Sequence, residues 1–172
     1  MKLNELKQSE NAPSIVEIAN VFAKQKDCEH RFASWDYCYG LAQCMYARKK
    51  DLTDSDYDYM ALSLAFYLAS WGMYRGSSFL LDKSYKIHIE PVKLIFSKDE
   101  LWKRSLSSIE LTAFGKELAN VYGVGDKVRA SNDGISGNMT DTLFTKILLG
   151  LTGNVIAYDR YCKTSLSAFG YG

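Results

Sequence analysis

Charged residues and aromatic rings alternate in three short segments of the chain, and this combination could bind a ligand. The segments span residues 30–37, 70–78 and 157–161. Rings supply flat apolar surfaces, whereas an arginine side chain can hold a carboxylate or phosphate through two parallel hydrogen bonds. If the three segments meet in the fold, they form a polar, aromatic-lined pocket suited to a planar or phosphorylated ligand. The residues that we predict to line this pocket are Trp35, Trp71, Tyr74, Arg75, Asp141, Lys146, Tyr158, Asp159 and Arg160.

The same side chains could instead form a structural network of ion pairs that fixes how the helices pack. A buried guanidinium group needs an acidic partner, because an uncompensated buried charge is strongly destabilising. Asp36, Asp141 and Asp159 are available as partners. The two interpretations are separable, since a closed core in which Asp159 only neutralises Arg75 would leave no room for a ligand.

A catalytic use of these charges is a further hypothesis. Arg75, Lys146 and Arg160 would hold a phosphate group while Asp159 acts as the general base, with Asp141 beside them. Such a site would belong to an enzyme that acts on a nucleotide or a nucleic acid. It requires all five groups within hydrogen-bonding reach of one cleft.

The motifs of familiar enzyme classes are missing, so we assign no catalytic residue, metal ligand or cofactor. His30 and His88 are far apart and belong to no HExxH or CxxC pattern, which argues against a transition-metal site. The GxSxG motif of hydrolases is absent. Gly123 and Gly125 begin a pattern like that of dinucleotide-binding loops, but the third glycine is missing and the pattern follows a predicted helix rather than a strand. Catalysis is therefore left open, and a non-enzymatic function is favoured.

Two parts of the sequence resemble known protein families. Residues 149–157, followed by Asp159, resemble the helix-hairpin-helix element of the DNA glycosylase superfamily, whose hairpin glycines at G-x-G spacing bind a DNA phosphate through backbone amides. Here Gly150 and Gly153 have G-x-x-G spacing, and Asp159 comes too soon to be that family's catalytic acid. A helix–turn–helix corner with glycines for close packing explains this segment better. Residues 34–37 and 70–78 look similar to uncharacterised helical proteins of bacteria and their phages, a resemblance that implies a setting such as defence but no activity.

Helical spacing of apolar residues dominates the elements that must position these side chains. Steps of three and four predict helices over residues 13–26 and 30–50. An acidic start rich in capping residues predicts a third helix over residues 53–71. This helix is apolar on nearly every side, so we expect it to be the central buried helix. Gly72 and Gly76 would end it or let another helix pack closely.

The second half of the chain is also predicted to be helical. Residues 85–90 alternate as a strand would but have no partner strand, so we expect an extended connection into the next helix. Ser97 with Glu100, and Ser107 with Glu110, match the capping-box pattern at a helix start. The predicted helices span residues 91–96, 98–104, 108–121, 140–149 and 155–165, with Gly123 ending the third of them.

The fold class that follows is all-α, a single compact domain of about six to eight helices around a buried central helix near residues 55–75. The chain of 172 residues is long enough for a real core and contains no repeat or linker. We expect residues 1–11 to fray and residues 123–138 to form one long loop. The domain therefore covers residues 1–172.

Composition limits the partners and the compartment. A formal net charge of +1 argues against bulk binding of nucleic acid or membrane surfaces. Cys38 and Cys44 fall in apolar helical sequence, where a thiol behaves as a small hydrophobe. With no signal peptide or spanning segment visible, we expect a cytoplasmic protein with reduced thiols. The favoured function is a non-enzymatic helical binding protein for a protein partner or a small ligand; an exposed aromatic patch without a pocket would favour the protein partner.

Overall fold

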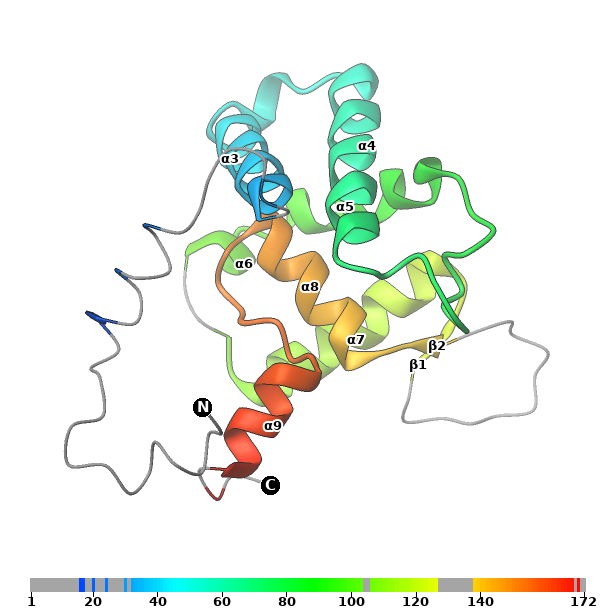
Figure 1. The fold of residues 1–172 in the computed structure, drawn as a ribbon. Helices are drawn as coiled ribbons and strands as arrows, with labels where there is room; N and C mark the ends of the chain where they lie inside the picture. Colours follow the sequence, from blue (N-terminus) through cyan, green and yellow to red (C-terminus); the bar gives the residue numbers. More distant parts are fainter. Residues whose placement is uncertain are drawn as a thin grey trace.

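The arrangement of the helices is given by a computed structural model, which describes residues 32–103, 106–126 and 138–168 and positions 16, 17, 20, 24, 30 and 170. Within these residues the chain forms seven α-helices, two 3₁₀ turns and one pair of very short strands (Figure 1). The elements are α3 (Ala33–Ala47), η1 (Lys49–Asp51), α4 (Asp54–Ser70), η2 (Tyr85–His88), α5 (Ile89–Ser97), α6 (Glu100–Lys103), α7 (Ser108–Tyr122), β1 (Gly125–Asp126), β2 (Asn138–Met139), α8 (Asp141–Leu151) and α9 (Arg160–Ala168). The predicted all-α, single compact domain is confirmed.

Helices α3 and α4 lie side by side, and local signals define where α4 begins and ends (Figure 1). The backbone N–H of Asp56 donates to the Thr53 hydroxyl at 3.3 Å, and the Asp56 carboxylate accepts the N–H of Thr53 at 2.8 Å. This capping box satisfies amides that have no partner inside the helix. At the other end, Gly72 has φ of +75°, which only glycine adopts at little cost, and the chain leaves the helix there. The helix predicted over residues 53–71 is confirmed.

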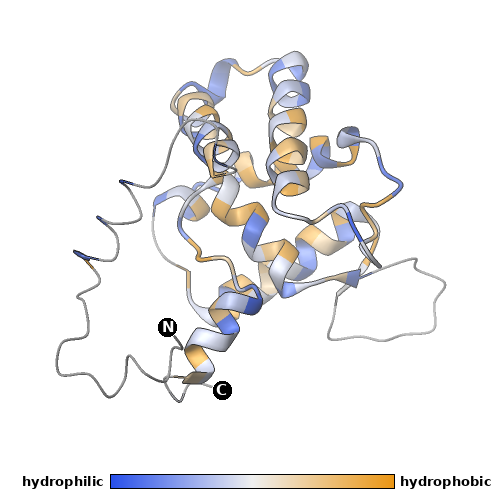
Figure 2. Ribbon diagram, in the orientation of Figure 1, coloured by the Kyte–Doolittle hydropathy of each residue, from blue (hydrophilic) through white to orange (hydrophobic). Residues whose placement is uncertain are grey.

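Helices α4 and α8 form the centre of the core. Helix α4 packs against α3, α5, η2 and α8, and α8 also packs against α3. Apolar residues recur along both helices (Figure 2), and buried residues of α3, α4 and α8 belong to one hydrophobic cluster. One part of the prediction is corrected: Tyr59, Leu62 and Phe66 are 47%, 46% and 63% exposed, so α4 is central but keeps an apolar stripe on its outer side.

Glycines at the end of α8 allow the helices to approach closely. A Cβ atom at Gly150 would lie 2.6 Å from Cε1 of Tyr67 on α4. Gly153, with φ of +71°, is equally close to α3, because a Cβ atom there would lie 2.7 Å from Cε2 of Tyr39. The glycines serve close packing as predicted, but the corner between two helices is not formed, because the next helix begins only at Arg160.

Two predictions about helix starts in the second half are wrong. Residues 85–90 are not extended: η2 and α5 cover them, because the Ser84 hydroxyl accepts the N–H of Lys86 and Pro91 falls in the first turn of α5, where no intrahelical N–H is lost. The last helix begins at Arg160 instead of residue 155. Its start is fixed by Asp159, whose Oδ1 accepts the backbone N–H groups of Tyr161 and Cys162, at 3.0 and 3.1 Å.

Two smaller predictions are also corrected. Ser97 does not cap α6 with Glu100, because it is the last residue of α5 and its hydroxyl donates to the Leu94 carbonyl at 2.7 Å. Cys44 is exposed, whereas Cys38 is fully buried as expected, and burial raises the pKa of the Cys38 thiol to about 12. By contrast, the capping box of Ser107 at the start of α7 is formed as predicted.

Several sequence predictions lie outside the described residues. These are the fraying of residues 1–11, most of the predicted helix over 13–26, and residues 127–137 of the predicted loop. The described ends of that loop are ordered by Gly123, which ends α7 with φ of +66°, and by β1 and β2, which pair in parallel. Among the helices that the structure describes, none has the length and apolar character needed to cross a membrane.

Candidate functional site

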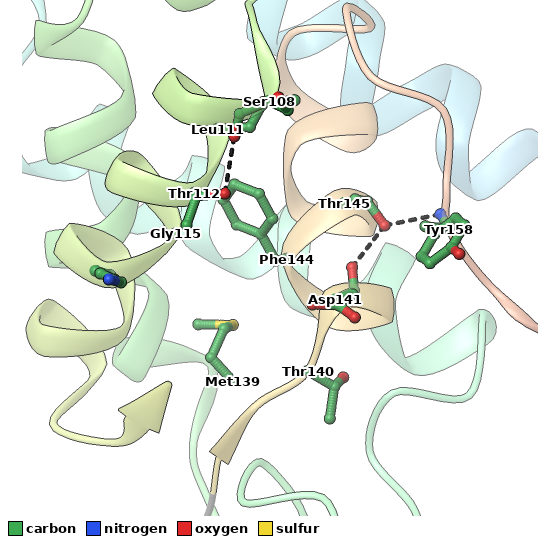
Figure 3. A pocket seen from close by; sticks show the side chains of 11 residues that line it. Ser108, Leu111, Thr112, Gly115, Met139, Thr140, Asp141, Phe144, Thr145 and Tyr158 are labelled. Carbon is green, nitrogen blue, oxygen red and sulfur yellow. Dashed lines mark hydrogen bonds between the residues drawn. The ribbon is translucent and has the colours of Figure 1, made fainter. Parts of the chain in front are cut away.

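A pocket of about 450 Å³ opens between α7 and the first half of α8, with Tyr158 at its edge (Figure 3). Its position follows from two helix starts, since the Ser107 cap fixes α7 and the Thr140 cap fixes α8. The Thr140 hydroxyl accepts the N–H of Leu143 at 3.2 Å. The residues that line the pocket are Ser108, Leu111, Thr112, Gly115, Lys116, Met139, Thr140, Asp141, Phe144, Thr145 and Tyr158.

The middle of this pocket is apolar. Leu111 on α7, Phe144 on α8 and Met139 supply its apolar side chains, and the Phe144 ring extends toward α7 near Thr112 (Figure 3). Gly115 lets the Phe144 ring lie close to α7, because a Cβ atom there would be in ordinary contact with Cζ of Phe144 at 3.7 Å. Any longer side chain at position 115 would therefore occupy the pocket itself.

The rim of the pocket is polar and carries both signs of charge. Ser108, Thr112 and Lys116 follow one another along α7, and Asp141 lies opposite on α8. The hydroxyl of Thr112 donates to the Ser108 carbonyl at 2.8 Å, so its oxygen remains able to accept a hydrogen bond from a ligand. The rim thus offers hydrogen-bonding groups around an apolar centre.

Tyr158 is held at the pocket edge through its backbone. Its N–H donates to the Thr145 hydroxyl at 2.8 Å, and its carbonyl accepts from the Thr142 hydroxyl at 3.0 Å. The Thr145 hydroxyl in turn donates to the Asp141 carbonyl at 2.7 Å (Figure 3). These three bonds fasten an irregular segment to α8 and leave Tyr158, which is 38% exposed, beside the opening.

A buried ion pair joins Lys146 of α8 to Asp159, whose carboxylate remains 21% exposed. Lys146 is only 5% exposed, and its Nζ donates to the Trp71 carbonyl at 3.2 Å and lies 5.3 Å from the centre of the Trp71 ring. The Asp159 Oδ2 atom is 3.8 Å from the same Nζ. Because the other carboxylate oxygen caps α9, Asp159 both neutralises Lys146 and starts the last helix.

A second buried cluster joins η2, α7 and the segment after α4. His88 is fully buried, with Nε2 2.6 Å from the Tyr74 hydroxyl and Nδ1 2.6 Å from the Tyr122 hydroxyl. Burial lowers the pKa of His88 to about 4 and raises the pKa of Tyr74 to about 12. All three rings are therefore neutral near pH 7, and the cluster anchors Tyr74 to the core.

The structure does not gather the nine predicted residues in one pocket. Asp141 and Tyr158 line the α7–α8 pocket. Trp71, Lys146 and Asp159 meet in the buried ion pair.

The other four predicted residues are separated from both places. Trp35 donates from Nε1 to the Leu149 carbonyl at 3.1 Å and so joins α3 to α8. Tyr74 belongs to the His88 cluster, and Arg160 is exposed with its guanidinium 5.1 Å from the Tyr161 ring. Arg75 lines a separate cavity of about 170 Å³ between residues 72–78 and the start of α8.

Sequence reasoning missed the α7 side of the pocket. Its signal was the stripe of small residues Ser108, Thr112 and Gly115, which recur at steps of three and four and so share one face of α7. A stripe without large apolar side chains leaves space against the neighbouring helix. His88 was also missed as a core residue, because its segment was expected to be extended.

Within the described residues no group of three or more His, Cys, Asp or Glu side chains is placed to hold a metal ion. No protein-family model, no curated protein and no solved structure matches the chain.

Proposed function

We propose that this chain is a non-enzymatic helical binding protein that holds a small ligand in the α7–α8 pocket. The observation that carries the proposal is the pocket itself, an apolar space between two capped helices with hydrogen-bonding groups on its rim. Its volume of about 450 Å³ lies within the range of roughly 300–1,000 Å³ that is usual for ligand sites.

The lining favours a ligand with a flat apolar part and a polar edge. Phe144 would contact a ring of the ligand in an offset or edge arrangement, and Leu111 would add aliphatic contact surface. Ser108 and Thr112 would bond to polar atoms at the ligand's edge. Lys116 and Asp141 carry opposite charges, so a ligand with little net charge fits this rim better than a strongly charged one.

The position of Asp159 supports binding over the enzymatic alternative. A general base needs a free lone pair aimed at a substrate. Here one oxygen of Asp159 accepts two backbone amides and the other lies beside buried Lys146. Arg75 and Arg160 lie in separate surroundings, so the five groups of the catalytic hypothesis do not share one cleft.

The proposal is tested by screening flat aromatic fragments against the purified protein by ligand-observed NMR and thermal shift. Fragments that bind the folded state raise the melting temperature by mass action. Gly115→Leu should abolish binding, because the new side chain fills the space beside Phe144.

Gly40→Leu is the matched control for this experiment. Gly40 lies on α3, is exposed, and has no atom within 4 Å of an added Cβ atom. The control should melt normally and bind the same fragments as the unmodified protein. Fragment binding that survives Gly115→Leu, or the absence of any hit, would contradict the proposal.

A protein partner is the second candidate, and a specific surface favours it. Tyr59, Leu62 and Phe66 form the exposed stripe on α4, and the hydroxyl of Tyr37 on α3 meets that of Tyr59. Exposed apolar patches of this kind often mark protein contacts. If the double variant Leu62→Ser, Phe66→Ser releases a co-purifying protein and leaves fragment binding intact, the stripe rather than the pocket carries the function. A partner protein retained by this double variant would argue against a binding role for the stripe.

The cellular setting stays a prediction from sequence. A cytoplasmic location and a bacterial or phage origin agree with the resemblance stated above, and localisation of a tagged chain in a bacterial host would test the first of these.

A further inference from the structure

We propose that the small cavity between residues 72–78 and the start of α8 binds a phosphate-type oxyanion, either inorganic phosphate or the phosphate of a monoester. The cavity has a volume of about 170 Å³, which is room for roughly six water molecules at about 30 Å³ each. It is lined by Gly72, Met73, Arg75, Ser77, Ser78, Asn138, Thr140, Thr142 and Leu143. Among these described lining residues Arg75 is the only charged one, and none of them carries a carboxylate.

The Arg75 guanidinium is available to a ligand and has a defined place. It makes no hydrogen bond or ion pair with the residues that the structure describes. It lies flat over Gly72, since a Cβ atom on that glycine would be 2.9 Å from both Cζ and Nε of Arg75. A planar guanidinium with free N–H groups is the side chain that best matches two oxygens of a phosphate.

The backbone that leads into Arg75 is fixed by three contacts, so little ordering of this segment is needed before an anion binds. Before it, the Trp71 carbonyl accepts from Lys146, and the N–H of Met73 donates to the Leu68 carbonyl at 2.8 Å. Next to it, the Tyr74 hydroxyl bonds to buried His88. A site that is ordered before binding loses less conformational entropy when the ligand arrives.

Hydroxyl groups of the lining can complete the coordination of the anion. The Ser78 hydroxyl accepts the N–H of Leu80, and the Thr140 hydroxyl accepts that of Leu143, so both keep their own protons free to donate. The start of α8 adds a partial positive charge as a minor contribution. Asp141, the nearest carboxylate in sequence, lines the α7–α8 pocket instead.

This inference does not depend on the proposed function, although the two cavities share Thr140. The oxyanion site would exist even if no fragment bound beside Phe144. Gly115→Leu should therefore leave phosphate binding unchanged.

The experiment is a titration of the full chain with inorganic phosphate and with phenyl phosphate, followed by ¹H–¹⁵N NMR including the Arg75 Nε–Hε signal. Sodium chloride at matched ionic strength serves as the salt control. We expect saturable shifts with phosphate and none with chloride. Arg75→Gln should weaken binding by about ten- to a hundredfold, whereas Arg160→Gln, which removes the same charge elsewhere, should change it by less than about twofold.

A pair of glycine variants tests the position of Arg75 without removing its charge. Gly72→Ala and Gly76→Ala both place alanine at a positive φ, +75° and +62°, but only the first displaces the guanidinium, because an added Cβ atom at Gly76 has no atom within 4 Å. Gly72→Ala should lose phosphate binding and Gly76→Ala should keep it. Equal losses in Arg75→Gln and Arg160→Gln would overturn the proposal, as would equal binding by the two glycine variants. If Gly72→Ala does not fold, the arginine pair decides alone.

Discussion

Replacing Gly150 with alanine should destabilise the protein, although alanine favours helices over glycine. An added Cβ atom would lie 2.6 and 2.8 Å from two ring carbons of Tyr67, which has no exposed surface into which the ring could move. Overpacking of this kind costs about 1–3 kcal/mol, and the enclosed ring places Gly150→Ala near the upper value. Because helix preference returns at most about 1 kcal/mol, we expect a net loss of about 2 kcal/mol in the free energy of unfolding.

Gly40→Ala is the matched control for this prediction. Gly40 is exposed within α3 and meets no atom within 4 Å of an added Cβ atom, so this variant should gain up to about 1 kcal/mol. The two variants should differ by about 3 kcal/mol, or roughly 6–12 °C in melting temperature for a chain of this length. Urea unfolding followed by circular dichroism measures both. If Gly150→Ala is stabilised as much as Gly40→Ala, the close approach of α8 to α4 at this glycine is refuted.

The remaining predictions concern the buried polar groups. His88 has a pKa of about 4 in the fold and about 6.5 in the unfolded chain, so over this pH range only the unfolded chain takes up the proton. The free energy of unfolding should therefore fall by about 3 kcal/mol as the pH drops from 6.5 to 4. His88→Gln should flatten this part of a pH series of unfolding curves. The Tyr67 hydroxyl has no hydrogen-bond partner among the described residues, so Tyr67→Phe should stabilise the fold by about 1 kcal/mol. Tyr122→Phe loses a hydrogen bond to His88 and should destabilise the fold by about 1 kcal/mol. The opposite order of melting temperatures would contradict both assignments. Asp159→Asn keeps a good capping residue for α9 but removes the countercharge of Lys146. Since the carboxylate is 21% exposed, we expect the free energy of unfolding to fall by about 1–2 kcal/mol, and this loss should disappear in a Lys146→Met background. A loss that persists there would show that Asp159 acts through capping and not through its charge.

Helix ends were predictable from the sequence where a local signal fixes them. The Thr53 and Ser107 capping boxes and the positive φ of Gly123 depend on residues within one turn, so their pattern is enough. Where a local signal competed with another, the prediction failed. Ser97 matches a capping pattern, but α5 continues to that residue and its hydroxyl bonds back into the same helix.

The candidate site was less predictable, because it depends on distances between elements far apart in sequence. Charged and aromatic residues drew attention to Arg75 and Asp159, yet the α7–α8 pocket is lined by Gly115 and Phe144. Gly115 matters because it has no side chain, which a search for charged or aromatic residues overlooks. The outcome for Asp159 shows the same limit. Its pairing with Lys146 instead of Arg75 is set by how α8 packs, which no spacing in the chain reveals.

The two hydrogen bonds of His88 fix which group donates and which accepts within the buried cluster. A neutral imidazole has one N–H and one bare nitrogen, so one tyrosine must donate to the ring and the other must accept from it. Tyr122 is 7% exposed and makes no other hydrogen bond in the described structure, so its proton has only Nδ1 to go to. Tyr74 is partly exposed and can give its proton to water. The side of the cluster that touches solvent thus selects the tautomer with hydrogen on Nε2, and the position of a single proton inside the protein is decided at its surface.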